Sequence, residues 1–174
     1  LTDRVHIARV IFSVSDVQRG IDSLDTNKSA GPDQLPPVFI KNCSNVMCWI
    51  LQKIFNKSIE SGIFPTAWKS SNIIPIFKKG DKSDVTSYRP ICIQSCIPKL
   101  FECILLSKIK SDLALVISDQ QHGFMQNRST LTNLLEFHCD IMDAFVTRSQ
   151  TDCVYTDYSK AFDRVSHTIL LAKL

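Results

Sequence analysis

The segment CVYTDYSKAFDRVSH, residues 153–167, joins an apolar run to two carboxylates whose spacing could serve chemistry. Asp157 follows β-branched and aromatic residues typical of a buried strand, and Asp163 lies six residues later. An ionised carboxylate among apolar neighbours is costly unless it is paired or binds a cation. At a strand end it can reach a cleft, where Mg²⁺ prefers one or two carboxylates with phosphate oxygens and water. The segment therefore indicates phosphoryl or nucleotidyl transfer, or a structural Asp157 that caps the next turn or pairs with Lys160.

Asp163 has a structural interpretation of its own, because it could cap its turn or form an ion pair with Arg164. Asp157 and Asp163 as an acid–base couple would define a hydrolase such as a glycosidase. No sugar-stacking aromatic cluster accompanies them. The sequence also lacks GxxxxGK[ST], GxGxxG, GxSxG and HExxH patterns, which argues against four common enzyme classes.

The composition fits a folded domain. The 174 residues are 44% hydrophobic and 21% charged, which suits one globular domain or one domain and part of a second. The net charge is +3, yet residues 41–110 hold eleven Lys and Arg against four Asp and Glu. A phosphate-rich partner would explain this basic segment, and so would a solvated basic face.

Signals for membranes, secretion and zinc are missing from the sequence. No apolar run approaches the ~20 residues of a membrane span, and no basic-then-apolar leader opens the chain. The seven cysteines are scattered without zinc-site spacing, and free thiols indicate a reducing compartment. A cytoplasmic and/or nuclear protein without a membrane partner is expected. Because the chain begins at Leu1 and ends at Leu174 within a helical pattern, a piece of a longer protein is expected.

Helices and short strands are mixed without regular alternation, which predicts an α+β fold. We expect helices over residues 15–24, 45–61, 97–115 and 129–148 and from about 167, and strands over 73–77, 88–93 and 153–158. Ser15 and Gln18 form a capping-box pattern, Gly62 is placed to stop a helix, and Pro75 indicates an edge strand or a bulge. The apolar stripes predict a core of Val17, Ile21, Leu24, Ile50, Ile54, Phe55, Leu100, Phe101, Ile104, Leu105, Leu134, Leu135, Ile141, Met142 and Phe145.

Four blocks of the sequence resemble the reverse transcriptases of non-LTR retrotransposons, in the same order and with similar spacing. VYTDYSKAFDRVSH resembles their first palm motif, and FPTAWKSSNIIPIFKKGDKSDVTSYRPICI resembles their fingers block. KSAGPDQLPP resembles the loop that precedes the fingers block, and QHGFMQNRSTLTNLLEF resembles the block just before the palm motif. The amino-acid sequence of these blocks is similar to that of jockey-like elements of arthropods. The resemblance runs from about Ser15 to Leu174.

The resemblance implies an RNA-directed DNA polymerase of the right-hand fold, with fingers in residues 1–148 and the start of the palm in residues 149–174. Its partners would be an RNA template, a DNA primer and a deoxynucleoside triphosphate. Its cofactor would be two Mg²⁺ ions, which activate the primer 3′-OH and stabilise the leaving pyrophosphate. Carried over to this chain, Asp157 would be the ligand of both ions, helped by the main-chain carbonyl of Tyr158.

The resemblance also assigns nucleotide contacts within the palm motif. Lys160 and Ala161 would present main-chain N–H groups to the triphosphate. Phe162 would be the aromatic plate under the sugar that rejects a 2′-OH, whereas the residues alone favour core packing for Phe162.

The remaining assignments are basic side chains that would meet phosphate. Arg89, with Lys79 or Lys78, would hold the triphosphate by charge stabilisation. Arg128 would meet template or primer phosphate. A solvated hairpin tip remains the alternative for Lys78 and Lys79, and a helix-start role remains the alternative for Arg128.

The chain departs from the family pattern at several positions. Asn127 and Gln34 stand where the family usually has Gly, and Cys92 and Gln94 replace a usual Ser and Leu. The next palm motif and the aromatic-Ala-Asp-Asp turn are not among the 174 residues, and one Asp cannot hold two Mg²⁺ ions. The chain alone is therefore expected to be inactive, with its palm strand lacking partner strands. The alternative is a non-catalytic RNA-binding remnant of a decayed element.

Overall fold

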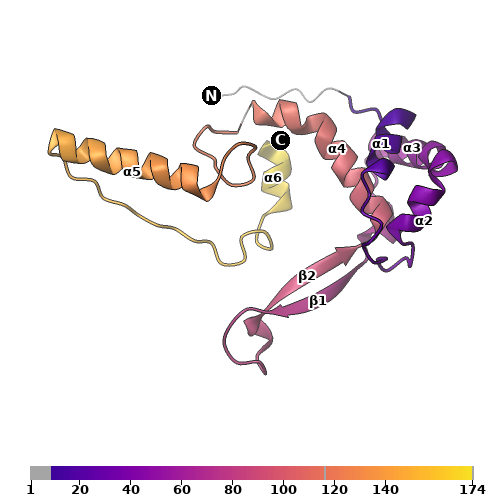
Figure 1. The fold of residues 1–174 in the computed structure, drawn as a ribbon, viewed down its shortest axis with the longest axis horizontal. Coiled ribbons are helices and arrows are strands. Elements are labelled where there is room, and N and C mark those ends of the chain that lie inside the picture. Colours follow the sequence, from indigo (N-terminus) through magenta and orange to yellow (C-terminus); the bar gives the residue numbers. More distant parts are fainter. Residues whose placement is uncertain (1–8, 116, 174) are drawn as a thin grey trace. The chain divides into compact units, whose positions relative to one another are not determined.

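The computed structural model describes residues 9–115 and 117–173, which form two compact units (Figure 1). We call residues 9–112 the N-terminal unit and residues 113–173 the C-terminal unit. Helices and strands are both present, in agreement with the predicted α+β class. None of the helices in the described residues is long and apolar enough to cross a membrane.

The N-terminal unit is mainly helical and carries one β-hairpin (Figure 1). Its elements are α1 (Val14–Asp22), α2 (Pro37–Asn42), α3 (Ser44–Ser61), the 3₁₀ turn η1 (Thr66–Lys69), β1 (Ser71–Phe77), the 3₁₀ turn η2 (Val85–Ser87), β2 (Tyr88–Gln94) and α4 (Cys96–Ala114). The elements of the C-terminal unit are α5 (Thr130–Thr147) and α6 (His167–Lys173). The long helices and both hairpin strands lie within a few residues of their predicted ranges.

The helix ends confirm one prediction from local sequence signals and contradict another. Gly62 ends α3 in the left-handed conformation with φ 65°, as predicted. The capping box predicted at Ser15 and Gln18 is wrong, because α1 begins earlier. Ser13 is the N-cap: the Asp16 N–H donates to Ser13 Oγ at 3.1 Å, and the Ser13 N–H donates to the Asp16 carboxylate at 2.9 Å.

The core of the N-terminal unit is an aromatic cluster to which the segment before α1, together with α3 and α4, contributes. The ring centroids of Phe55 and Phe101 are 5.2 Å apart, and those of Phe12 and Phe101 are 5.7 Å apart, both edge to face. Phe64 and Trp68, which precede the hairpin, complete the cluster. Each fully buried ring contributes ~1.5–3 kcal/mol, so this cluster holds the helices and the start of β1 together.

The predicted core is confirmed for α1 and α4 and is partly wrong for α3. Val17, Ile21, Phe55, Leu100, Phe101 and Ile104 are buried, and Leu24 and Leu105 are half-buried. Ile50 and Ile54, however, are 47% and 40% exposed. The buried row of α3 is Cys48, Leu51, Phe55 and Ser58, which follows the three- and four-residue spacing of one helix face. Because Phe55 packs into the aromatic core, this face of α3 turns inward. Ile50 and Ile54 lie on a different face of the helix and stay exposed.

The C-terminal unit leaves its predicted core positions uncovered. Ser129 caps α5 as predicted, since the Thr132 N–H donates to Ser129 Oγ at 3.2 Å. No α5 residue is buried, however: Leu134, Leu135, Met142 and Phe145 are exposed and Ile141 is half-buried. The apolar stripe is therefore present without neighbours that cover it among residues 117–173.

The buried strand predicted at 153–158 is wrong for the described structure. Residues 151–158 form no regular element, and their side chains are exposed. A strand needs a neighbour to bond its main-chain N–H and C=O groups. The described residues contain one sheet, the β1–β2 hairpin, so this segment has no partner strand.

An ion pair between a buried carboxylate and an exposed lysine joins α1 to α4. Lys108 Nζ lies 2.7 Å from Asp16 Oδ2, and the Asp16 side chain is only 6% exposed. Burial acts to raise the pKa of Asp16. Hydrogen bonds from Lys108 and Ser13 outweigh it and lower the pKa from 3.8 to about 2.

We expect Asp16→Asn to lower the free energy of unfolding at pH 7 by roughly 2 kcal/mol, because the folded-state pKa is depressed. This stabilisation is present above the unfolded-state pKa of about 4 and is lost as the pH falls toward 2. Urea unfolding at pH 7, 4 and 3 measures it for the wild type and the variant. Asp25→Asn, at an exposed site, is the control and should change little. Equal effects of the two substitutions would contradict the role of Asp16.

Candidate functional site

The β1–β2 hairpin accommodates two prolines without losing a ladder hydrogen bond. In its antiparallel register Pro75 faces Pro90, and the Lys78 N–H donates to the Ser87 carbonyl at 2.8 Å. Hydrogen-bonded and non-bonded pairs alternate along such a ladder. The Pro75–Pro90 pair is therefore one of the pairs that exchange no ladder hydrogen bonds. At this pair, a main-chain N–H would point away from the partner strand, so the ladder loses nothing where proline lacks one. This confirms the prediction that Pro75 marks an edge strand.

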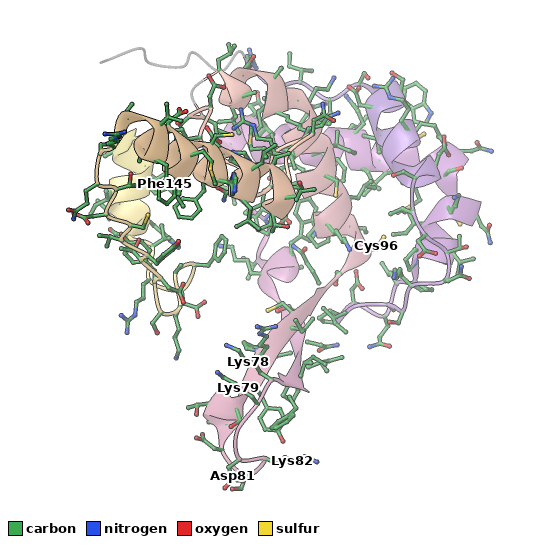
Figure 2. The ribbon with its side chains drawn as sticks, turned by 60° about the vertical axis from the view of Figure 1, so that its left-hand side comes forward. Lys78, Lys79, Asp81, Lys82, Cys96 and Phe145 are labelled. Atoms are coloured by element: carbon green, nitrogen blue, oxygen red, sulfur yellow. The ribbon has the colours of Figure 1, made fainter. Side chains whose placement is uncertain are left out.

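The register brings two of the predicted basic residues onto one face of the hairpin. Arg89 pairs with Ile76, and Lys78 lies two residues beyond Ile76, so both side chains leave the same face. Lys79 follows at the start of the tip loop, as Figure 2 shows. All three side chains are exposed, and none makes an ion pair within the described part of the chain. Their positive charges remain available to an anion.

Polar contacts within the tip hold this loop in shape. Tyr88 Oη donates to the Lys82 carbonyl at 2.8 Å, and the Ser83 N–H donates to Asp81 Oδ1 at 2.9 Å. The hydrogen bonds from Ser83 lower the pKa of Asp81. Asp81 and Lys82 lie at the far end of the hairpin in Figure 2. The loop thus keeps a fixed form beyond the last strand pair.

The base of the hairpin lies against the loop that precedes α2. A Cβ at Gly31 would come within 2.5 Å of the Ser95 Cα and 2.6 Å of its nitrogen, so the two backbones touch. Lys41 holds the same loop by donating to the main-chain carbonyls of Asp22 and Leu24 at 2.8 and 3.1 Å. The KSAGPD segment therefore supports the point where β2 passes into α4.

Two of the departures from the family pattern occupy left-handed backbone. Gln34 has φ 59° and Asn127 has φ 62°. These are the two positions at which the resemblance leads us to expect Gly. Glycine adopts this conformation at little cost, whereas a side chain raises its energy by roughly 1–2 kcal/mol. Asparagine tolerates it better than glutamine. The turn geometry is therefore kept at both positions, with the larger strain at Gln34.

Arg128 is engaged by its own segment. Its guanidinium donates to the Gln121 carbonyl at 3.2 Å and lies 3.5 Å from Asp119 Oδ1. These contacts fix the approach to α5 and support the helix-start role that the sequence left open. A contact between Arg128 and nucleic-acid phosphate stays a prediction.

His122 also belongs to this segment, and sequence reasoning overlooked it. Its ring nitrogens lie 3.0 Å from Thr132 Oγ1 and 2.7 Å from Glu136 Oε2. Thr132 and Glu136 are one turn apart on α5, a spacing that places them side by side. Thr132 and Glu136 follow His122 by ten and fourteen residues. This spacing was the sequence signal that could have predicted the contact of His122 with α5.

Asp157 and its neighbours in the palm-like motif are exposed and contact little. Tyr158 and Phe162 are 79% and 85% exposed, so core packing does not apply to Phe162 here. Lys160 has φ 54° and starts a turn that the Arg164 N–H closes on the Lys160 carbonyl at 3.1 Å. Among the described residues, neither the Asp157–Lys160 nor the Asp163–Arg164 ion pair is formed.

The donor atoms at Asp157 suit a hard cation, but they are few. A carboxylate and a main-chain carbonyl are the oxygen ligands that Mg²⁺ takes. Within the described residues, however, no three His, Cys, Asp or Glu side chains gather as a metal-binding group. Asp157 therefore offers one carboxylate, and a two-ion site needs further ones.

Comparisons of the sequence with known proteins show the family of the chain. A sequence model of the family "Reverse transcriptase (RNA-dependent DNA polymerase)" matches residues 76–174, from β1 through the palm-like motif. The chain belongs to the reverse transcriptase family. Because relatives of the chain carry the name RNA-directed DNA polymerase, the family is one of nucleotidyltransferases.

Several relatives are polymerases of mobile elements from Drosophila melanogaster. The chain is 30% identical over 164 residues to the probable RNA-directed DNA polymerase from transposon BS and 31% identical over 164 residues to that from mobile element jockey. It is 27% identical over 166 residues to the probable polymerase from transposon X-element. These matches cover 92%, 92% and 94% of this chain, which spans 18% of the length of each relative. The predicted resemblance to jockey-like non-LTR reverse transcriptases is confirmed.

We expect Gly31→Ala to destabilise the chain by about 1–3 kcal/mol, because its Cβ would meet the Ser95 backbone, which cannot move aside as a side chain would. The urea midpoint followed by far-UV circular dichroism measures the change. Gly123→Ala is the matched control, since its Cβ would meet only the end of the Gln121 side chain at 3.3 Å. A Gly31→Ala variant as stable as Gly123→Ala would refute the close contact.

At Gln34 we expect glycine to stabilise the chain by about 0.5–1 kcal/mol, since relief of left-handed strain exceeds the extra freedom of the unfolded chain. Gln34→Ala keeps the strain and should give no gain. Asn127→Gly should gain less than Gln34→Gly. Thermal unfolding of the three variants ranks them, and a Gln34→Ala variant that gains as much as Gln34→Gly would show that the backbone conformation is not the cause.

Proposed function

We propose that the chain forms the fingers, residues 1–148, and the start of the palm, residues 149–174, of an RNA-directed DNA polymerase of the right-hand fold. The observation that carries the proposal is the hairpin face shared by Arg89 and Lys78, within a segment that belongs to the reverse transcriptase family. RNA template, DNA primer and deoxynucleoside triphosphate are the proposed partners.

In this proposal the hairpin holds the triphosphate. A planar guanidinium binds phosphate through two parallel hydrogen bonds, and an ammonium acts as a point charge. Arg89 would therefore orient the triphosphate, and Lys78 or Lys79 would neutralise it. The freedom of these three side chains from ion pairs among the described residues supports such a role.

The palm-like motif would supply main-chain and aromatic contacts. The N–H groups of Lys160 and Ala161 donate to no main-chain carbonyl in the described structure, which leaves them free for phosphate oxygens. A left-handed residue in a turn, such as Lys160, favours an anion-binding concavity of successive N–H groups. The exposed ring of Phe162 is available as a plate under the sugar.

Asp157 and the carbonyl of Tyr158 would hold Mg²⁺. When bound, a pair of such ions activates the primer 3′-OH and stabilises the leaving pyrophosphate. Asp157 makes no ion pair in the described residues, so its carboxylate is not neutralised by a neighbour. Residues 1–174 by themselves should give no DNA synthesis, because Asp157 alone cannot place two ions.

A second candidate function is RNA binding without catalysis. It is favoured by the exposed basic hairpin, which it would use alone. The two functions differ in their dependence on Asp157.

The test is primer extension by the jockey polymerase with residues 1–174 of this chain in place of its matched segment. We expect Asp157→Asn to abolish synthesis, because an amide cannot replace a carboxylate as a metal ligand. Asp163→Asn is the matched control and should retain most activity. In the 174-residue chain, Asp157→Asn should leave RNA binding unchanged. An inactive chimera with Asp157 intact, or an active Asp157→Asn chimera, would favour the RNA-binding alternative.

A further inference from the structure

The outer side of α3 carries a groove that none of the residues assigned above occupies. It has a volume of about 400 Å³ and lies between the chain segment before α1 and one side of α3. Arg9, Val10 and Ile11 form one wall, and Gln52, Lys53, Asn56, Lys57, Ile59 and Glu60 form the other. Both walls belong to the N-terminal unit.

The two walls are joined by hydrogen bonds to the main chain of Phe12. The Phe12 N–H donates to Asn56 Oδ1 at 2.8 Å. Its carbonyl accepts from Asn56 Nδ2 at 2.8 Å and from Gln52 Nε2 at 3.0 Å. The Phe12 side chain is fully buried in the aromatic core. The groove is therefore a preformed feature, since its wall is held by both core packing and side-chain hydrogen bonds.

The charges in the groove are mostly positive and only partly neutralised. Lys57 lies 3.2 Å from Glu60 and is paired with it. Arg9 and Lys53 make no ion pair within the described residues. Two adjacent uncompensated cations favour an anionic ligand.

An exposed tryptophan extends the same side of α3. Trp49 is 59% exposed and precedes Lys53 by four residues, which places the two side chains one above the other. Surfaces that bind single-stranded nucleic acid combine cations for the phosphates with an aromatic ring on which a base stacks. Trp49, Lys53 and Arg9 supply these components.

We propose that this groove binds the phosphodiester backbone of single-stranded RNA, with Arg9 and Lys53 on phosphates and a base stacked on Trp49. The proposal rests on the proposed nucleic-acid function and adds a contact surface separate from the hairpin. RNA is favoured over an acidic protein segment because every nucleotide offers both a phosphate for the cations and a base that can stack on the exposed ring.

The test uses the 174-residue chain and a 12-nucleotide single-stranded RNA of mixed sequence. The chain has two tryptophans, and Trp68 packs against Phe55, Phe64 and Phe101. RNA should therefore quench mainly the fluorescence of Trp49, and Trp49→Phe should remove most of the quenching. Quenching that survives in Trp49→Phe would overturn the stacking contact.

Salt dependence of binding, followed by fluorescence anisotropy of labelled RNA, tests the cations. Removal of one cation that binds a phosphate of a single strand lowers the slope of log K against log salt by about 0.7. The Arg9→Gln/Lys53→Gln variant should reduce the slope by about twice that amount. The Lys28→Gln/Lys99→Gln variant, which removes two charges outside the groove, should reduce it less. Equal slopes for these two variants would overturn the groove as a phosphate site.

A hairpin variant separates failure of this inference from failure of the proposed function. If Lys78→Gln/Lys79→Gln alone weakens binding, the hairpin binds RNA and the groove does not. If the wild-type chain binds no RNA, the groove inference and the RNA-binding alternative fall, whereas primer extension by the chimera still decides the polymerase proposal. If an acidic peptide quenches Trp49 and RNA does not, the groove binds protein instead and the inference is overturned.

Discussion

The position of the β1–β2 hairpin depends on how its two ends enter the aromatic core. A two-stranded hairpin exposed on both faces is marginally stable by itself. Trp68 packs into the core just before β1, and Ser95 is buried just after β2 where Gly31 touches it. Phe101 of α4 then joins the same cluster. The basic face of the hairpin is thus oriented by contacts at its base, and not by anything along its length.

The elements that the sequence predicted well are those whose signals are local. The long amphipathic helices, the glycine that stops α3 and the proline that marks an edge strand all act within a few residues. One error arose where two residue pairs fit the same capping-box pattern. Ser13 with Asp16 and Ser15 with Gln18 both fit it. The structure uses Ser13 with Asp16, where Lys108 of α4 also contacts Asp16. The rotation of α3 likewise depends on Phe55 meeting rings from other segments.

The strand predicted at 153–158 failed for a different reason. Alternating apolar residues record which side chains favour burial, but they do not supply the partner whose main chain completes the ladder. The apolar stripe of α5 carries the same kind of information. Both patterns in the C-terminal unit indicate surfaces suited to packing. Within residues 117–173 they stay mostly exposed, with one ring contact between Phe137 and Tyr155. The roles of the residues near Asp157 were predicted from their motif and stay a prediction, whereas the local backbone geometry could not be predicted from it.

Both units carry charged side chains that make no ion pair among the described residues. Arg89 and Lys78 stay uncompensated at the hairpin, and Asp157 stays uncompensated in the palm-like motif, although each has opposite charges nearby in sequence. Exposed ion pairs contribute little to stability, so folding does not select them. In the proposed function, the free cations of the hairpin would bind a triphosphate, and the free carboxylate of Asp157 would bind a metal ion. Folding alone leaves such groups unpaired at little cost, and binding gives a reason for them to stay so.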